Sequence, residues 1–77
     1  MSGLPVVSGT ELIRLLRGLG YQVVRQRGSH VRLVSELPSG RHAITVPAHA
    51  ELARGTLNDI LNNVSGRIGL PKERLID

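Results

Sequence analysis

The 77-residue sequence predicts an α+β fold, a three-stranded antiparallel sheet with two helices on one face. Two observations carry this prediction. Leucine-rich segments near the two ends have apolar residues three and four positions apart, the spacing of helices with one buried face. Between them lie three segments of strand character, separated by turn signals that contain glycine. The order helix–strand–strand–strand–helix leaves the other face of the sheet free.

The first helix is expected to begin at a capping box. Ser8 is the cap, and Glu11 reaches back to it from three residues on. Apolar residues then repeat at helical spacing, and Ile13 widens their stripe. The stripe consists of Leu12, Leu15, Leu16 and Leu19. Gly18 and Gly20 end the helix, because glycine accepts the left-handed conformation that often follows a last turn.

The strands are expected at residues 21–27, 30–36 and 41–46. Gly28 and Ser29 form the first turn, residues 37–40 form the second, and Pro47 closes the third strand because proline cannot donate to a ladder. Side chains alternate along a strand. If Val31 and Leu33 point into the core, His30 and Arg32 therefore share the outer face of the sheet.

The second helix is expected to begin at Thr56, with Asp59 as the acid of a second capping box, and to end before Gly66. Its apolar stripe consists of Leu57, Ile60, Leu61 and Val64. Pro71 suits the start of a last short turn. In the tail, the residues expected to cover the core are Leu70, Leu75 and Ile76.

We expect one domain over residues 1–77, with residues 1–7 as an N-terminal arm and residues 66–77 as a tail that packs on the core. The chain has no cysteine, which excludes disulfides and thiolate metal sites and suits a reducing compartment. Residues 1–8 lack the features of a signal peptide, and no apolar run is long enough to span a bilayer. These observations predict a cytoplasmic protein.

The charge balance favours a polyanionic or acidic partner. The formal net charge is +4, and nine of the ten basic residues are arginines, which bind phosphate through two parallel hydrogen bonds. Tyr21 is the only aromatic residue. Base-stacking platforms need several aromatic faces, so any contact with nucleic acid should rest mainly on its backbone and shape.

The element order resembles the double-stranded-RNA-binding architecture, and the residues resemble the HicA toxin family over about residues 8–64. The segments that carry this resemblance are Gly20-Tyr21, Arg25-Gln26-Arg27-Gly28-Ser29-His30, Val46-Pro47-Ala48-His49, Gly55-Thr56-Leu57 and Ile60-Leu61. The resemblance implies a small RNA-cleaving toxin, an mRNA interferase, neutralised by a HicB-type antitoxin. It also implies that the essential histidine is the one closing Gly-Ser-His, here His30.

These residue types suit metal-free cleavage of RNA. Histidine titrates near neutral pH, so His30 is the candidate general base for the 2′-hydroxyl, and nearby positive charge favours its neutral form. His49 is the candidate general acid if its loop folds back beside the hairpin. Expected contacts to RNA come from arginines, from a turn that admits a phosphate and from a helix N-terminus. They are Arg25, Arg27, Arg32, Gly28, Ser29 and Thr56.

Two other interpretations stay open. In the first, the protein is a non-catalytic RNA-binding module of the same fold. In the second, it is a small adaptor whose free sheet face binds an acidic protein. His42 has the opposite strand parity to its neighbours and is interpreted as structural. The three histidines do not have the spacing of a zinc site, so we expect neither a metal nor a cofactor.

Overall fold

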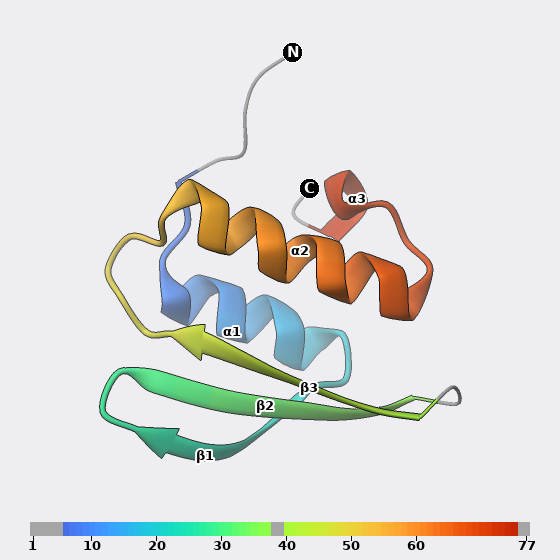
Figure 1. Cartoon of the computed structure of the whole chain (residues 1–77), viewed down its shortest axis with the longest axis horizontal. Coiled ribbons are helices and arrows are strands. Elements are labelled where there is room, and N and C mark those ends of the chain that lie inside the picture. The colour runs from blue at the N-terminus through green and yellow to red at the C-terminus, as the bar shows by residue number, and fades with distance from the viewer. Residues whose placement is uncertain (1–5, 38–39, 76–77) are drawn as a thin grey trace.

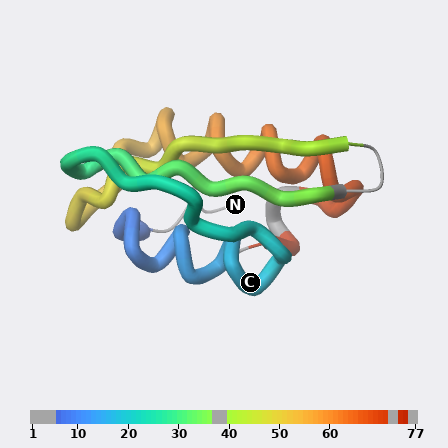
Figure 2. Tube along the Cα trace, turned by 90° about the horizontal axis from the view of Figure 1, so that it is seen from below, coloured from blue at the N-terminus to red at the C-terminus, as the bar shows by residue number. Residues whose placement is uncertain are grey.

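A computed structural model of the protein describes residues 6–37 and 40–75. In chain order the elements are α1 (Gly9–Gly18), β1 (Gln22–Arg27), β2 (His30–Leu37), β3 (Gly40–Pro47), α2 (Arg54–Ile68) and α3 (Lys72–Leu75) (Figure 1). The strands form one antiparallel sheet in the order β1-β2-β3. Both long helices cover the same face of the sheet, as Figure 1 and the view turned by 90° in Figure 2 show. The predicted α+β fold is confirmed.

Helix α1 begins and ends as its sequence predicts. The Ser8 hydroxyl accepts a hydrogen bond from the Glu11 N–H at 3.0 Å, and the Glu11 carboxylate accepts one from the Ser8 N–H at 2.9 Å. This second bond lowers the pKa of the Glu11 carboxyl. At the other end Gly20 has φ 104°, and the Tyr21 N–H donates to the Leu16 carbonyl at 3.0 Å. These contacts form a Schellman motif.

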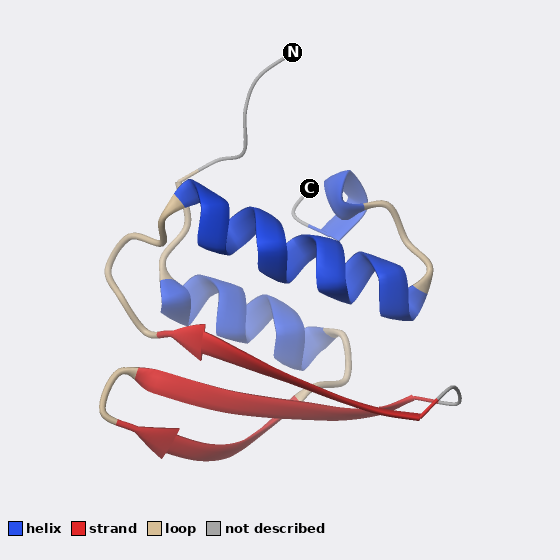
Figure 3. Ribbon diagram, viewed as in Figure 1, coloured by secondary structure: helices blue, strands red, loops and turns tan. Residues whose placement is uncertain are grey.

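The core lies between the sheet and the helices, in the layer that Figure 3 shows between red strands and blue ribbons (Figure 3). Its side chains come from both helices, from the strands and from the loop before α2. The buried cluster consists of Leu12, Leu16, Tyr21, Val31, Leu33, Ile44, Val46, Leu52, Leu57, Ile60, Leu61, Val64 and Leu75. The helical stripes are thus confirmed, with Leu15 and Leu19 only partly buried at the margin of this cluster.

Gly9 allows α1 to approach the end of β3 very closely. A Cβ atom at this position would lie 2.1 Å from the Pro47 carbonyl oxygen and 2.7 Å from the Ala48 Cα. The Gly9 N–H also donates to the His49 carbonyl at 2.9 Å. Only glycine fits here, so this residue fixes the first turn of α1 against the chain that leaves the sheet.

The register between β1 and β2 contains an irregularity that the sequence pattern did not predict. Val23 pairs with Leu33, but the next pair along the ladder joins Arg25 to Arg32. Val24 is therefore an extra residue, a β-bulge. The β2–β3 ladder is regular from His30 and Pro47 to Leu37 and Gly40.

Two predictions for α2 are wrong. The helix begins at Arg54 with Ala53 as its N-cap and no side-chain cap, so Thr56 lies inside the first turn and forms no capping box with Asp59. Its start is fixed instead by tertiary contacts: Leu52 is buried, and its N–H donates to the Val7 carbonyl at 2.9 Å. Such anchoring overrides the modest preference for a polar cap.

The end of α2 also differs from the prediction. The helix continues through Gly66 to Ile68, and Gly69, with φ 78°, takes the left-handed conformation at its end. An interior glycine costs about 0.5–1 kcal/mol relative to alanine. The packing of Ile68 against the core offsets that cost.

The tail covers the core through one residue of the three expected. Leu75, in α3, is buried, whereas Leu70 is exposed. Ile76 lies outside the described residues, as do residues 1–5 of the expected arm and Pro38 and Ser39 of the second turn. α3 follows Pro71, whose carbonyl accepts from the Arg74 N–H at 2.9 Å.

Candidate functional site

The hairpin between β1 and β2 brings the predicted site residues together. Arg27 pairs with His30 across the turn, and Arg25 pairs with Arg32 one step further along the outer face. Gly28 has φ 59°, a conformation that other residues rarely adopt, and its carbonyl accepts from the Gln26 side-chain amide at 3.2 Å. The tight turn therefore places His30 at the end of the outer face, next to Arg27 and followed along the strands by Arg25 and Arg32.

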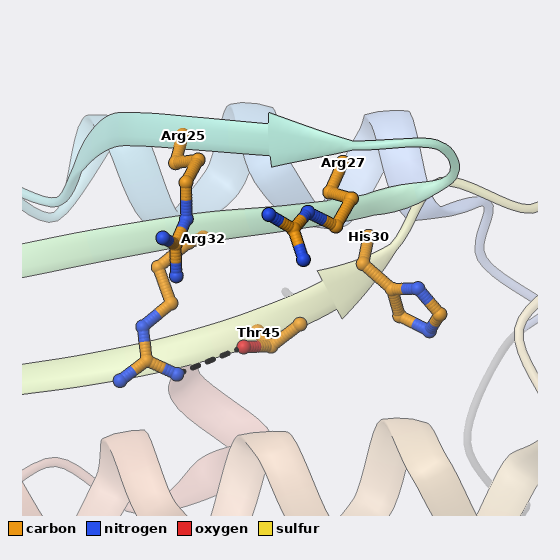
Figure 4. A pocket seen from close by; sticks show the side chains of 5 residues that line it. All are labelled: Arg25, Arg27, His30, Arg32 and Thr45. Atoms are coloured by element: carbon orange, nitrogen blue, oxygen red, sulfur yellow. Dashed lines mark hydrogen bonds between the residues drawn. The ribbon is translucent and has the colours of Figure 1, made fainter.

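These side chains line a concavity of about 280 Å³ on the outer face of the sheet, which Figure 4 shows from close by (Figure 4). Its lining comes from all three strands and consists of Arg25, Arg27, His30, Arg32 and Thr45. Each of the five residues is exposed to solvent. The Arg32 guanidinium donates to the Thr45 hydroxyl at 3.0 Å, which orients one donor group toward β3.

The concavity is positively charged and contains no carboxylate among its lining residues. In the described part of the chain the one ion pair joins Arg41 to Glu36, with 3.4 Å between nitrogen and oxygen. Arg25, Arg27 and Arg32 form no ion pair there. Guanidinium groups without a carboxylate partner are available for phosphate, which they bind in a forked geometry.

The turn of the hairpin is also bonded to the loop that carries His49. The Ala48 N–H donates to the Ser29 carbonyl at 2.6 Å, and the His49 carbonyl accepts from Gly9. The backbone of this loop therefore lies beside the hairpin, which was the condition for His49 to take part. Its exposed side chain is not among those lining the concavity.

Comparison with known protein families gives a match that includes the hairpin of the candidate site. The model of the HicA toxin family of bacterial toxin–antitoxin systems matches residues 9–64, from the first residue of α1 to Val64 in α2. The chain belongs to the HicA toxin family. The match includes all three strands and the whole β1–β2 hairpin. Comparisons with curated proteins and with solved structures gave no match.

The family assignment fixes a coarse role for this chain, that of a toxin with an antitoxin partner. It assigns no chemistry to individual residues. Four of the residues predicted to act on RNA line the concavity, and Gly28 and Ser29 form the turn beside it. Thr56 does not join them, because it lies in α2, on the other side of the sheet.

Two features of this HicA site were not predicted from the sequence. Thr45 pairs with Arg32 in the regular β2–β3 ladder and reaches the concavity from the third strand. The alternation of β3, in which Ile44 and Val46 are buried, could have placed Thr45 on the outer face. No signal in the sequence indicated the bulge at Val24. This bulge brings the Val24 side chain to the outer face, where it lines a neighbouring concavity.

His42 lies on the opposite face from His30 and is half-buried. The Tyr21 hydroxyl and the His42 Nδ1 are 2.6 Å apart, and the two rings meet edge to face with centroids 5.8 Å apart. Burial, and after it the charge of Arg67, lowers the pKa of His42, while burial raises that of Tyr21. The Tyr21 hydroxyl and the His42 ring therefore share a hydrogen bond at the edge of the core, which agrees with a structural role for His42.

Among the described residues, no three or more histidine, aspartate or glutamate side chains are grouped so that they could hold a metal ion. Within the same ranges, no helix has the length and apolar character needed to cross a membrane.

Proposed function

We propose that this HicA toxin is an endoribonuclease that cleaves mRNA without a metal ion, with His30 as its general base. The observation that carries the proposal is the concavity on the outer face, which His30 lines at one end together with three arginines that form no ion pair in the described part of the chain. A phosphodiester with an adjacent hydroxyl is the substrate that this set of groups suits. The partner that neutralises the toxin is proposed to be a HicB-type antitoxin.

The proposed reaction uses a nucleophile that RNA itself provides. Neutral His30 takes the proton of the 2′-hydroxyl, and the 2′-oxygen forms a bond to the adjacent phosphorus. The bond from phosphorus to the 5′-oxygen breaks, and that oxygen leaves with a proton. The products are a 2′,3′-cyclic phosphate and a 5′-hydroxyl end.

Arg25, Arg27 and Arg32 supply positive charge where negative charge develops on the phosphoryl oxygens. The Arg32–Thr45 hydrogen bond holds one of these groups in place before substrate binds. Gly28 and Ser29 carry no bulky side chain and let a phosphate approach the turn. Thr56, on the far layer, is kept in this proposal only as a peripheral contact at the α2 N-terminus.

The leaving 5′-oxygen needs a proton, and His49 is the proposed donor. Its loop is bonded to the turn that precedes His30. A substrate with a sulfur in place of the 5′-oxygen needs no acid, because a thiolate leaves without a proton. A His49→Ala variant should therefore cleave this substrate at the wild-type rate and ordinary RNA more slowly. If both substrates are cleaved equally slowly, His49 is not the acid.

The proposed activity is tested with purified toxin, free of antitoxin, on a long RNA in EDTA. Wild type should cleave the RNA and leave cyclic phosphate ends, and His30→Ala should not. Arg17→Ala, an exposed arginine on α1, is the matched control for general loss of positive charge. An RNA with a single 2′-deoxy position at a cleavage site should resist cutting there.

The opposite results would decide between the alternatives. If neither protein cuts but both bind the RNA equally, with affinity that falls steeply with salt, the chain is a non-catalytic RNA-binding module. If neither binds RNA and the antitoxin binds tightly, the free sheet face serves only as a protein-binding surface. Cleavage that EDTA abolishes would contradict the metal-free reaction.

A further inference from the structure

The concavity at His30 is one end of a longer hollow along β2. A second concavity of about 450 Å³ shares Arg25 and Arg32 with the first, and a third of about 220 Å³ shares Val24, Val34 and Arg41 with the second. We call these three the outer trough. Its length follows β2 from His30 to Glu36, about 20 Å at the usual rise per residue.

The middle of the trough has an apolar floor, which we define as Val24, Val34 and Ala43. The bulge in β1 turns Val24 toward the trough instead of the core, and this side chain is 52% exposed. Val34 also points outward but is only 8% exposed, because its neighbours in the trough cover it. The floor is a concave apolar surface on the side of the sheet that none of the described helices covers.

Arginines surround this floor. Arg25, Arg32 and Arg41 line the same concavity as the three apolar residues. Arg41 pairs with Glu36, but both side chains are well exposed, and such a surface pair contributes little. Arg41 can therefore exchange the carboxylate for a phosphate. An apolar floor between arginines matches a nucleotide, which joins an apolar base face to charged phosphates.

We propose that the apolar floor binds an unpaired base of single-stranded RNA, next to the phosphodiester held at His30. This inference rests on the proposed function and names the form of RNA that the site accepts. A paired base turns its faces to its neighbours in the helix, so only an unstacked base can lie on Val24 and Ala43. The base is held without aromatic stacking, because Tyr21, the only aromatic residue, is buried.

The contact should tolerate different bases, because aliphatic side chains recognise an apolar face and not a pattern of hydrogen bonds. Guanidinium groups of the rim add planar contacts to the base and charge to the phosphates. The floor thus binds the nucleotide next to the one whose phosphodiester is cleaved at His30. The arginines at the His30 end of the trough bind the phosphate of that phosphodiester.

The test measures binding apart from cleavage. In a His30→Ala background, affinity is measured for a short single-stranded RNA and for the same RNA with one abasic position at the site expected over the floor. Val24→Ser should weaken binding of the intact RNA by about fivefold, because it removes exposed apolar surface. Val23→Ser is the matched control, since Val23 is similarly exposed on the same strand but pairs with inward-facing Leu33.

The abasic RNA decides whether the base makes the contact. Val24→Ser and its parent should bind it with equal affinity, and Val23→Ser should match the parent for both RNAs. The inference is overturned if Val24→Ser has no effect, if it weakens both RNAs equally, or if the parent binds no RNA. The two proposals can fail separately. If wild type does not cleave RNA in EDTA but Val24→Ser still weakens binding of the intact RNA only, the proposed nuclease activity is refuted and the proposed base site stands.

Discussion

His30 and His42 lie on adjacent strands of one sheet but face opposite ways. His30 lines one end of the outer trough, which arginines also line, whereas His42 points toward the helices and shares a hydrogen bond with the buried Tyr21. The residue type is the same, and the fold gives each histidine a different set of neighbours. His30 is exposed on the open face, whereas burial lowers the pKa of His42.

The difference arises from strand parity and from what covers each face. Two helices remove water from the inner face, so polar groups there need partners inside the protein. In the described part of the chain no helix covers the outer face, and the arginines of that face are exposed to solvent. Four measurements test this difference between the two faces, beginning with the variant that should change most.

The largest effect is expected on catalysis. His30→Ala should lower the RNA cleavage rate by at least about 100-fold, the contribution typical of a general base. His42→Asn, whose side-chain amide can still form a hydrogen bond with the Tyr21 hydroxyl, should leave the rate per folded molecule unchanged. Single-turnover cleavage of a defined RNA measures both. Equal losses in the two variants would show that the two faces do not differ in function.

Stability should show the reverse order. His42→Ala leaves the buried Tyr21 hydroxyl without its partner and should cost about 1–3 kcal/mol of unfolding free energy. His30→Ala changes an exposed residue and should stay within about 0.5 kcal/mol of wild type. Urea denaturation measures both. Adding Tyr21→Phe to His42→Ala should recover part of the loss, and a failure to do so would indicate a simple packing effect.

Arginines on the two faces should differ in their effect on RNA binding. Arg32→Gln should weaken binding and lower the slope of log affinity against log salt by about 0.7, the value for one phosphate of a single strand. Arg67→Gln should leave the slope unchanged, because this guanidinium donates to the Arg41 carbonyl near His42 and lies outside the trough. The same slope for both variants would mean that charge alone binds the RNA.

The smallest effect is a dependence of stability on pH. Because the folded state lowers the pKa of His42, the unfolded chain binds that proton more readily. Stability is therefore highest above about pH 6.5, the ordinary value, and falls as the pH drops toward the folded-state pKa. His42→Asn should flatten this part of the profile between pH 7 and 5. An unchanged slope would assign the effect to another group.

Local patterns predicted most of the fold. The capping box at Ser8, the glycine stop at Gly20 and the alternation of β2 depend on residues close in sequence, and the structure confirms them. The start of α2 could not be predicted in this way. It is set by Leu52 and Val7, which lie far apart in sequence and meet only in the folded chain.

The candidate site likewise has one part that local patterns predicted and another that depends on how the strands pair. The segment from Arg25 to His30 indicated an imidazole among arginines, since one hairpin holds them all. Thr45 and the apolar floor come from cross-strand register and a bulge, which depend on how strands pair. Thr56 was expected at this site because helix N-termini attract anions, but α2 lies on the other layer.

The element order, the buried stripes and the face on which His30 lies follow from local patterns, because periodicity and turn chemistry act over a few residues. The surroundings of each residue depend instead on how distant parts of the chain pack together. This packing placed Gly9 against Pro47, fixed His42 on Tyr21 and turned Val24 outward into the trough. Such contacts join residues distant in the chain, and packing and register, which no local pattern encodes, select them.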